Sequence, residues 1–93
     1  DNLIDCDKIV GKICLRTRRE GDKFTFPKRK VTKSLKKLFN ELNIPVENRS
    51  SLPVLCDDLG VIWIHSVGVD ARCSVDTDSS NIIFVRGEDN DRQ

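Results

Sequence analysis

The fold is decided by the stretch Thr32-Lys33-Ser34-Leu35-Lys36-Lys37-Leu38-Phe39-Asn40-Glu41-Leu42-Asn43. Its apolar residues recur at the i, i+3, i+4, i+7 spacing that places side chains on one face of a helix: Leu35, Leu38, Phe39 and Leu42. Thr32 can cap such a helix, so we predict a helix from Thr32 to Leu42 or Asn43. Lys33, Lys36 and Lys37 would then share its exposed face and favour an anionic partner.

The segments on either side of this helix have the short apolar patterns of β-strands. Before the helix they are residues 3–7, 12–18 and 24–26, with a turn at Glu20-Gly21-Asp22. After it, Pro45 starts a second, short helix that runs to about Ser50. Residues 53–56 and 61–64 form a hairpin around residues 57–60, and residues 82–86 form a last strand.

These elements predict an α+β domain with a small, mostly antiparallel sheet, one main helix packed on it and a second short helix. The chain has 93 residues, which suits a single domain. We expect the domain to span residues 1–86, and residues 87–93 to be a polar tail without fixed structure.

Membrane and secreted classes are disfavoured. The longest apolar runs have four residues, as in residues 61–64, whereas a membrane span needs about 20. No signal peptide is visible, so we expect a cytoplasmic protein and four reduced thiols: Cys6, Cys14, Cys56 and Cys73. These cysteines and the single histidine, His65, lack the paired spacing of zinc ligands, so no metal is expected. Because the chain begins with Asp1 rather than Met, we expect a mature or excised fragment.

The charge is strongly separated along the chain. Residues 16–37 hold ten Lys or Arg against two acids and carry +8, whereas residues 57–93 carry −5. Such a basic segment favours a polyanion, because each neutralised phosphate releases condensed counterions. The alternative is a solvated face whose charge the acidic half balances after folding.

Several residues have structural interpretations. One arginine among Arg16, Arg18 and Arg19 is expected to pair with an acid such as Asp57. Arg49 is expected to form an ion pair or a helix cap. Trp63 is expected in the core, and the turn explains Asp57 and Asp58.

Five segments, in order, resemble the C-terminal domain of bacterial tRNA(Ile)-lysidine synthases. They are Leu15-Arg16-Thr17-Arg18-Arg19-Glu20-Gly21-Asp22-Lys23-Phe24; Thr32-Lys33-Ser34-Leu35-Lys36-Lys37-Leu38-Phe39; Ile44-Pro45 with Asn48-Arg49; Leu52-Pro53-Val54-Leu55 with Asp57; and Val61-Ile62-Trp63-Ile64 with Val67-Gly68-Val69-Asp70-Ala71-Arg72. The resemblance covers roughly residues 3–85. Glu20 departs from it where the family commonly has Pro, and so do His65 and Ser66 where the family often has Gly or Pro.

The resemblance implies a parent enzyme that uses ATP to attach lysine to the wobble cytidine of isoleucine tRNA. In that family, catalysis belongs to an N-terminal domain with a Ser-Gly-Gly-x-Asp-Ser phosphate loop, a motif absent here. The resemblance therefore implies no cofactor and no activity for this chain alone, with ATP used by the parent's N-terminal domain. It also implies a fold like a small domain of phenylalanyl-tRNA synthetase, and tRNA held near its acceptor region.

The expected tRNA-binding residues are the ten cations of the basic segment: Arg16, Arg18, Arg19, Lys23, Lys28, Arg29, Lys30, Lys33, Lys36 and Lys37. No catalytic residue is expected. A protein-interaction or scaffold domain remains the alternative, in which the basic half docks on the N-terminal catalytic domain or on a second copy in a homodimer.

Overall fold

Antiparallel pairing between short strands organises the computed structural model, which describes residues 2–87. Within these residues the elements are, in chain order, β1 (Leu3–Asp5), a 3-10 turn (Cys6–Lys8), β2 (Cys14–Arg16), β3 (Lys23–Thr25), β4 (Thr32–Ser34), α1 (Leu35–Glu41), α2 (Val46–Arg49), β5 (Val54–Cys56), β6 (Val61–Ile64), β7 (Gly68–Val69), a second 3-10 turn (Ala71–Cys73) and β8 (Ile82–Phe84). The predicted α+β class is confirmed.

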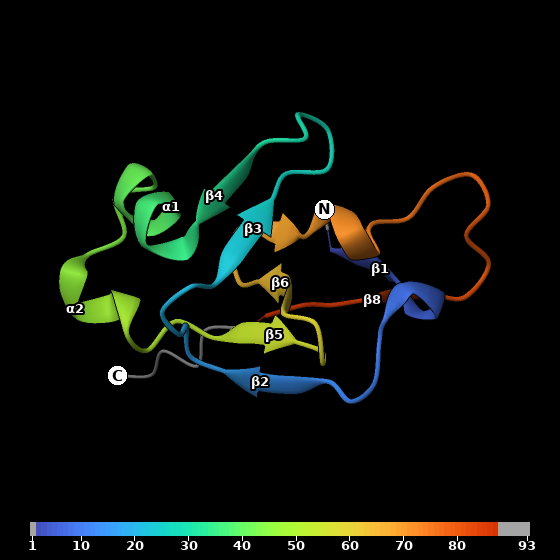
Figure 1. The fold of residues 1–93 in the computed structure, drawn as a ribbon, viewed down its shortest axis with the longest axis horizontal. Helices are drawn as coiled ribbons and strands as arrows, with labels where there is room; N and C mark the ends of the chain where they lie inside the picture. The colour runs from blue at the N-terminus through green and yellow to red at the C-terminus, as the bar shows by residue number, and fades with distance from the viewer. Residues whose placement is uncertain (1, 88–93) are drawn as a thin grey trace.

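The strands form three small sheets. The central one has the order β2-β5-β6-β7, while β3 pairs with β4 and β1 pairs with β8. Figure 1 shows the β3–β4 loop extending from the top of the molecule, the two helices on the left, and the segment between the second 3-10 turn and β8 on the right. The hairpin of β5 and β6 was predicted, and it forms around the turn at residues 57–60.

Two groups of buried side chains hold these sheets together. The larger joins α1 and β3 to β5 and β6: Phe24, Leu35, Leu38, Phe39, Val54, Cys56, Val61 and Ile64. The smaller joins β1, β6, β7 and the second 3-10 turn: Ile4, Ile62, Trp63, Val69 and Cys73. The predicted apolar face is confirmed as the core face for Leu35, Leu38 and Phe39, and Trp63 is buried as predicted. The prediction is wrong for Leu42, which follows the last residue of α1 and is 47% exposed.

The predicted N-cap of the main helix, Thr32, is wrong by two residues. Thr32, Lys33 and Ser34 form β4 instead, and the helix begins at Leu35, with the Ser34 hydroxyl accepting from Lys37 N–H at 3.2 Å. Both Thr32 and Ser34 can act as caps. β4 continues into α1 because Thr32 is paired with Thr25 of β3, so pairing with the preceding strand overrides the capping signal of Thr32.

Asn43 ends α1. Its φ of 58° is left-handed, its N–H bonds to the carbonyl of Asn40, and the next N–H, of Ile44, bonds to that of Phe39. This is a Schellman motif, which satisfies carbonyls that the last turn of a helix leaves unpaired. The polypeptide then turns into α2, whose Pro45 lies at the N-cap, close to the predicted start.

The remaining differences concern lengths. β1, β2 and β8 are shorter than predicted, and β7 was not predicted because a two-residue strand has no readable period. Residues 88–93 of the predicted tail lie outside the described part of the chain, so the tail stays a prediction. No helix between residues 2 and 87 is long and apolar enough to cross a membrane.

Candidate nucleic-acid interface

Asp22 shapes the loop that carries the paired arginines. Its carboxylate accepts two hydrogen bonds from the Arg16 guanidinium, at 2.9 and 3.1 Å, and one from the backbone N–H of Arg19 at 2.7 Å. Gly21, at φ 93°, allows the turn that brings Asp22 back toward Arg16. The loop from β2 to β3 is therefore closed on itself by one carboxylate.

This arrangement keeps Asp22 charged. Burial alone would raise the pKa of Asp22, but the hydrogen bonds from Arg16 and Arg19 outweigh it and hold the pKa below its ordinary value. Arg16 is correspondingly engaged, with its side chain 17% exposed. The prediction that one of the three arginines is structural is confirmed for Arg16, but its partner is Asp22 rather than Asp57.

The closed loop presents Arg18 and Arg19 beside the start of α1. They line an open groove of about 660 Å³ together with Ser34 and Lys36. Neither the two arginine side chains nor that of Lys36 forms an ion pair or hydrogen bond with residues 2–87. Glu20 and Asp22 line the same groove, but the Asp22 carboxylate is bonded to Arg16. The three cations therefore face one other carboxylate, that of Glu20, and the surface keeps an excess of positive charge that suits phosphate oxygens.

A second group of cations lies on the loop between β3 and β4. Lys28, Arg29 and Lys30 are exposed there, and the guanidinium of Arg29 lies 4.4 Å from the centre of the Phe26 ring. Lys30 is held at φ 55° by the bond from its N–H to the carbonyl of Phe26, at 2.8 Å. Lys23, another of the ten expected tRNA-binding residues, is exposed on β3.

The predicted cluster of three lysines on one helix face is wrong. Lys33 belongs to β4, and its ammonium pairs with the Glu41 carboxylate of α1. Lys36 and Lys37 are exposed on the helix as predicted. The hydrogen bond from Lys33, aided by the charges of Lys37 and Arg29, holds the pKa of Glu41 below its usual value. Lys33 is therefore a weaker candidate for phosphate contact than its neighbours.

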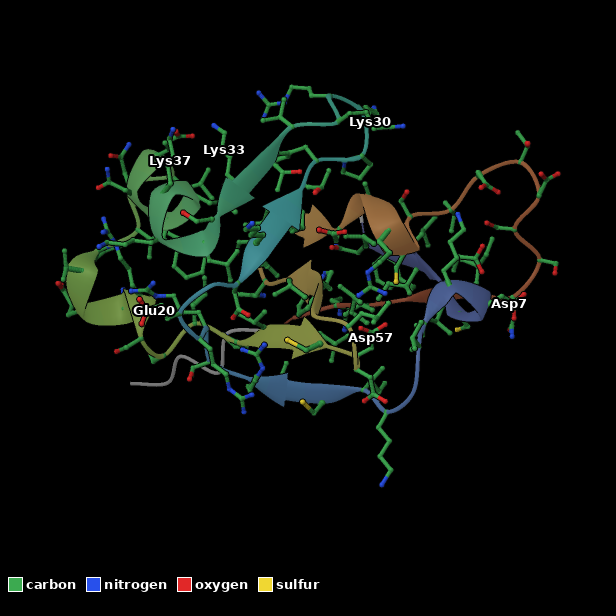
Figure 2. All side chains as sticks on the ribbon, in the orientation of Figure 1. Asp7, Glu20, Lys30, Lys33, Lys37 and Asp57 are labelled. Carbon is green, nitrogen blue, oxygen red and sulfur yellow. The ribbon has the colours of Figure 1, made fainter. Side chains whose placement is uncertain are left out.

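The basic elements lie together in space. Figure 2 shows Lys30, Lys33 and Lys37 along the upper edge of the molecule, on the loop, β4 and α1, with Asp7 at the opposite end from α1. Asp76 and Asp78 of the acidic half lie on the segment between the second 3-10 turn and β8, on the right in Figure 1, so part of the charge separation in the sequence is also a separation in the folded domain. Glu20, the acid that departs from the family pattern, lines the Arg18 groove and lowers its positive charge.

Two structural ion pairs were missed by sequence reasoning. Asp57 binds Arg72 through two hydrogen bonds, at 2.8 and 2.9 Å, and also accepts from the N–H groups of Val10, Leu59 and Gly60. Asp22 was read only as a turn residue. Its position one residue after Gly21, in a loop with three arginines, is a signal for an intraloop pair. Arg49 donates to the carbonyl of Ile44 at 2.7 Å and is structural as expected.

Comparison with known proteins shows the family to which the chain is related. Residues 13–85 match the family model of the TilS substrate C-terminal domain. The tRNA(Ile)-lysidine synthases of Clostridium tetani and Clostridium acetobutylicum are 33% and 34% identical over 84 residues, which is 90% of this chain. The chain spans 18% of the length of each of these relatives.

The fold agrees with the sequence match. A solved structure titled "Crystal structure of TILS C-terminal domain" superposes with a TM-score of 0.73 and 26% identity, covering 87% of this chain and 62% of that one. The matched region contains the Asp22-closed loop, the β3–β4 loop and α1. The chain therefore belongs to the TilS substrate C-terminal domain family.

Proposed function

We propose that this domain binds tRNA through its basic surface, for a parent enzyme that uses ATP to attach lysine to the wobble cytidine of isoleucine tRNA. The observation that carries the proposal is the groove that Arg18, Arg19 and Lys36 line, where these cations outnumber the acids and form no ion pair among residues 2–87. The family and the names of the relatives support it, since both are tRNA(Ile)-lysidine synthases.

The groove and the β3–β4 loop would act as two contact regions on one RNA backbone. Guanidinium groups can hold phosphate oxygens through paired hydrogen bonds, and ammonium groups add point charges. Such contacts position an RNA without reading its sequence. Base identity, lysine and ATP would then be handled by the catalytic part of the parent enzyme, and its N-terminal domain would be the second partner of this chain. A cytoplasmic location follows from the proposal, because its substrate is tRNA.

The decisive measurement is the salt dependence of tRNA binding. Replacing Arg18, Arg19 and Lys36 together with Ala should weaken binding and flatten the log–log salt slope. With the duplex-DNA value of about 0.9 per phosphate contact, three lost contacts remove roughly 2.7 units of slope. The effect should be similar for tRNAs of different sequence.

Two controls separate the proposal from a general loss of charge. Lys12→Ala removes an exposed cation just before β2, away from the groove, and should change the slope less than Lys36→Ala does. The thermal midpoints of all variants should stay close to that of the parent chain. Unchanged tRNA affinity in the triple variant, together with lost docking to the separately prepared catalytic part, would favour a scaffold function instead.

The chain should be inactive alone. Incubated with labelled ATP, lysine and tRNA, it should give background counts, because its glycines are isolated and cannot form a phosphate-binding loop. Lysine transfer by a pure sample would contradict this division of labour.

A further inference from the structure

A second groove lies between the β3–β4 loop and β7, apart from the Arg18 groove. It has a volume of about 670 Å³, and its walls include the apolar side chains of Leu3, Phe26, Pro27, Val67, Val69 and Val75. The volume lies within the range of about 300–1,000 Å³ typical of small-molecule sites. The salt-dependent contacts proposed above leave this apolar space unexplained.

The rim of this groove is cationic. Lys28 and Arg29 line it, and both side chains are exposed. The loop that carries them is held by two backbone hydrogen bonds between Phe26 and its far side, to Lys30 at 2.8 Å and to Val31 at 2.9 Å. The cations are therefore presented at a fixed edge of the apolar wall. An apolar interior with a cationic rim matches a ligand that has a flat, weakly polar body and an attached anion.

Only some of the aromatic side chains are accessible to a nucleic-acid base. Phe24, Phe39 and Trp63 are buried, and the indole N–H of Trp63 donates to Asn2, so none of them can receive a base. Among the described residues this leaves Phe26, which is half-buried in the groove, and Phe84, which is exposed on β8. Of these two, Phe26 lines a groove together with Lys28 and Arg29, and the Arg29 guanidinium lies 4.4 Å from the centre of its ring.

We propose that this groove takes the unstacked base of a single-stranded RNA nucleotide, while Lys28 and Arg29 hold the adjoining phosphate. This inference rests on the proposed tRNA-binding function and assigns it a second, base-dependent contact. Charge complementarity selects the occupant: the cationic rim matches a nucleotide, whose base and phosphate are covalently joined. The groove accepts a base by its apolar face, so it gains affinity without requiring one particular base.

The test separates bases from phosphates. Three RNAs are compared: a blunt stem, the same stem with a four-nucleotide single-stranded 3′ extension, and the stem with an abasic extension that keeps every phosphate. The chain should bind the base-bearing extension about tenfold more tightly than the abasic one, the size of one stacked base. The abasic extension should add only the salt-dependent part of the affinity.

Matched variants locate the base. Val75→Asp puts a carboxylate in the groove wall and should bring the ratio of the two affinities close to one. Thr77→Asp adds the same charge two residues along the same loop, at an exposed position outside the groove, and should leave the ratio unchanged. Val75→Thr keeps the shape of the side chain and should lower the ratio in the same direction, should Val75→Asp fold poorly. Phe84→Ala should leave it unchanged.

The outcomes distinguish this site from the function on which it rests. Equal affinity for base-bearing and abasic extensions, with salt-sensitive binding to the stem, overturns the groove and leaves the proposed function standing. Failure to bind any of the RNAs overturns the proposed function. An equal fall of the ratio in the Val75→Asp and Thr77→Asp variants, or its loss in Phe84→Ala, places the base elsewhere on the domain and overturns the assignment to this groove.

Discussion

At the scale of single residues, the carboxylate of Asp57 connects several parts of the fold through hydrogen bonds. It is buried, and five donors converge on its two oxygens: three backbone N–H groups and both terminal nitrogens of Arg72. These donors tie the β5–β6 turn to the segment before β2 and to the second 3-10 turn. One carboxylate thus joins three parts of the chain that are distant in sequence.

The pKa of Asp57 gives this tie a pH dependence. Burial alone would raise the pKa, but the bonds from Arg72 and from the backbone N–H groups of Val10 and Leu59 hold it well below its usual range. A group whose folded pKa is depressed adds stability above its unfolded pKa, about 3.9, and that stability is lost as the pH falls. The loss should begin near pH 5 and continue toward lower pH.

Replacing the carboxylate tests this account. Asp57→Asn should lower the free energy of unfolding at pH 7 by about 2 kcal/mol, because hydrogen bonds to a charged group are weakened. The variant should also lose less stability than the parent chain between pH 7 and pH 3. Urea denaturation at each pH measures both effects.

The adjacent carboxylate supplies the control. Asp58 is exposed, and Asp58→Asn should change the free energy of unfolding at pH 7 by less than about 0.5 kcal/mol. A similar acid-induced loss in the Asp57→Asn variant and the parent chain would show that other carboxylates dominate.

At the scale of elements, the boundary between β4 and α1 shows which features the sequence predicts and which depend on strand pairing. The apolar stripe of α1 and the turn at residues 57–60 were predicted because both depend on residues close in sequence. The start of α1 depends on the pairing of β4 with β3, and the state of Lys33 depends on Glu41. Neither contact was predicted, because the capping signal of Thr32 does not show that this residue is paired in a strand. The partner of Arg16 was wrong for another reason: Asp22 lies only six residues away, and its position in the arginine-bearing loop was interpreted as a turn alone.

The cap of α1 offers a direct comparison of the two candidate residues. Ser34→Ala should cost about 1 kcal/mol, because the N–H of Lys37 loses its acceptor. Thr32→Ala should cost only a few tenths, since its hydroxyl makes one exposed cross-strand contact with Thr25 at 2.7 Å. Thermal unfolding of the two variants decides which residue caps the helix, and the reverse order would favour the helix start predicted from sequence.

At the C-terminal end of α1, a substitution at Asn43 can raise the stability of the domain. Asn43 adopts a left-handed backbone that glycine occupies without steric strain. Asn43→Gly should therefore be neutral or stabilise the domain by up to about 1 kcal/mol, whereas Asn43→Ala should destabilise it by about the same amount. Chemical denaturation of the pair measures the difference. A more stable alanine variant would exclude the Schellman ending.

At the scale of the whole molecule, the four cysteines report on the integrity of the two cores. All four are free thiols; Cys14 is exposed, Cys6 is half-buried, and Cys56 and Cys73 are buried. Burial raises the pKa of Cys56 and of Cys73, which further lowers the reactivity of these thiols.

Alkylation of the native domain should therefore occur in order. Cys14 should react first, and Cys56 and Cys73 at least roughly a thousandfold more slowly, since they become accessible only through unfolding. Under denaturing conditions without reductant all four thiols should react. Mass spectrometry of the modified peptides measures the order, and fast modification of Cys73 would show that the core around β1 opens separately from the rest.

The basic edge that holds Lys30, Lys33 and Lys37 lies apart from the segment that holds Asp76 and Asp78, so the described part of the domain is an electric dipole although the net charge of the chain is only +1. In the field of a polyanion such a dipole experiences a torque, so the domain rotates its basic edge forward before any contact forms. Screening limits this alignment to about 8 Å at physiological ionic strength. Diluting the salt therefore lengthens the distance over which the domain is oriented, and encounter should quicken more steeply than one unit of charge would allow.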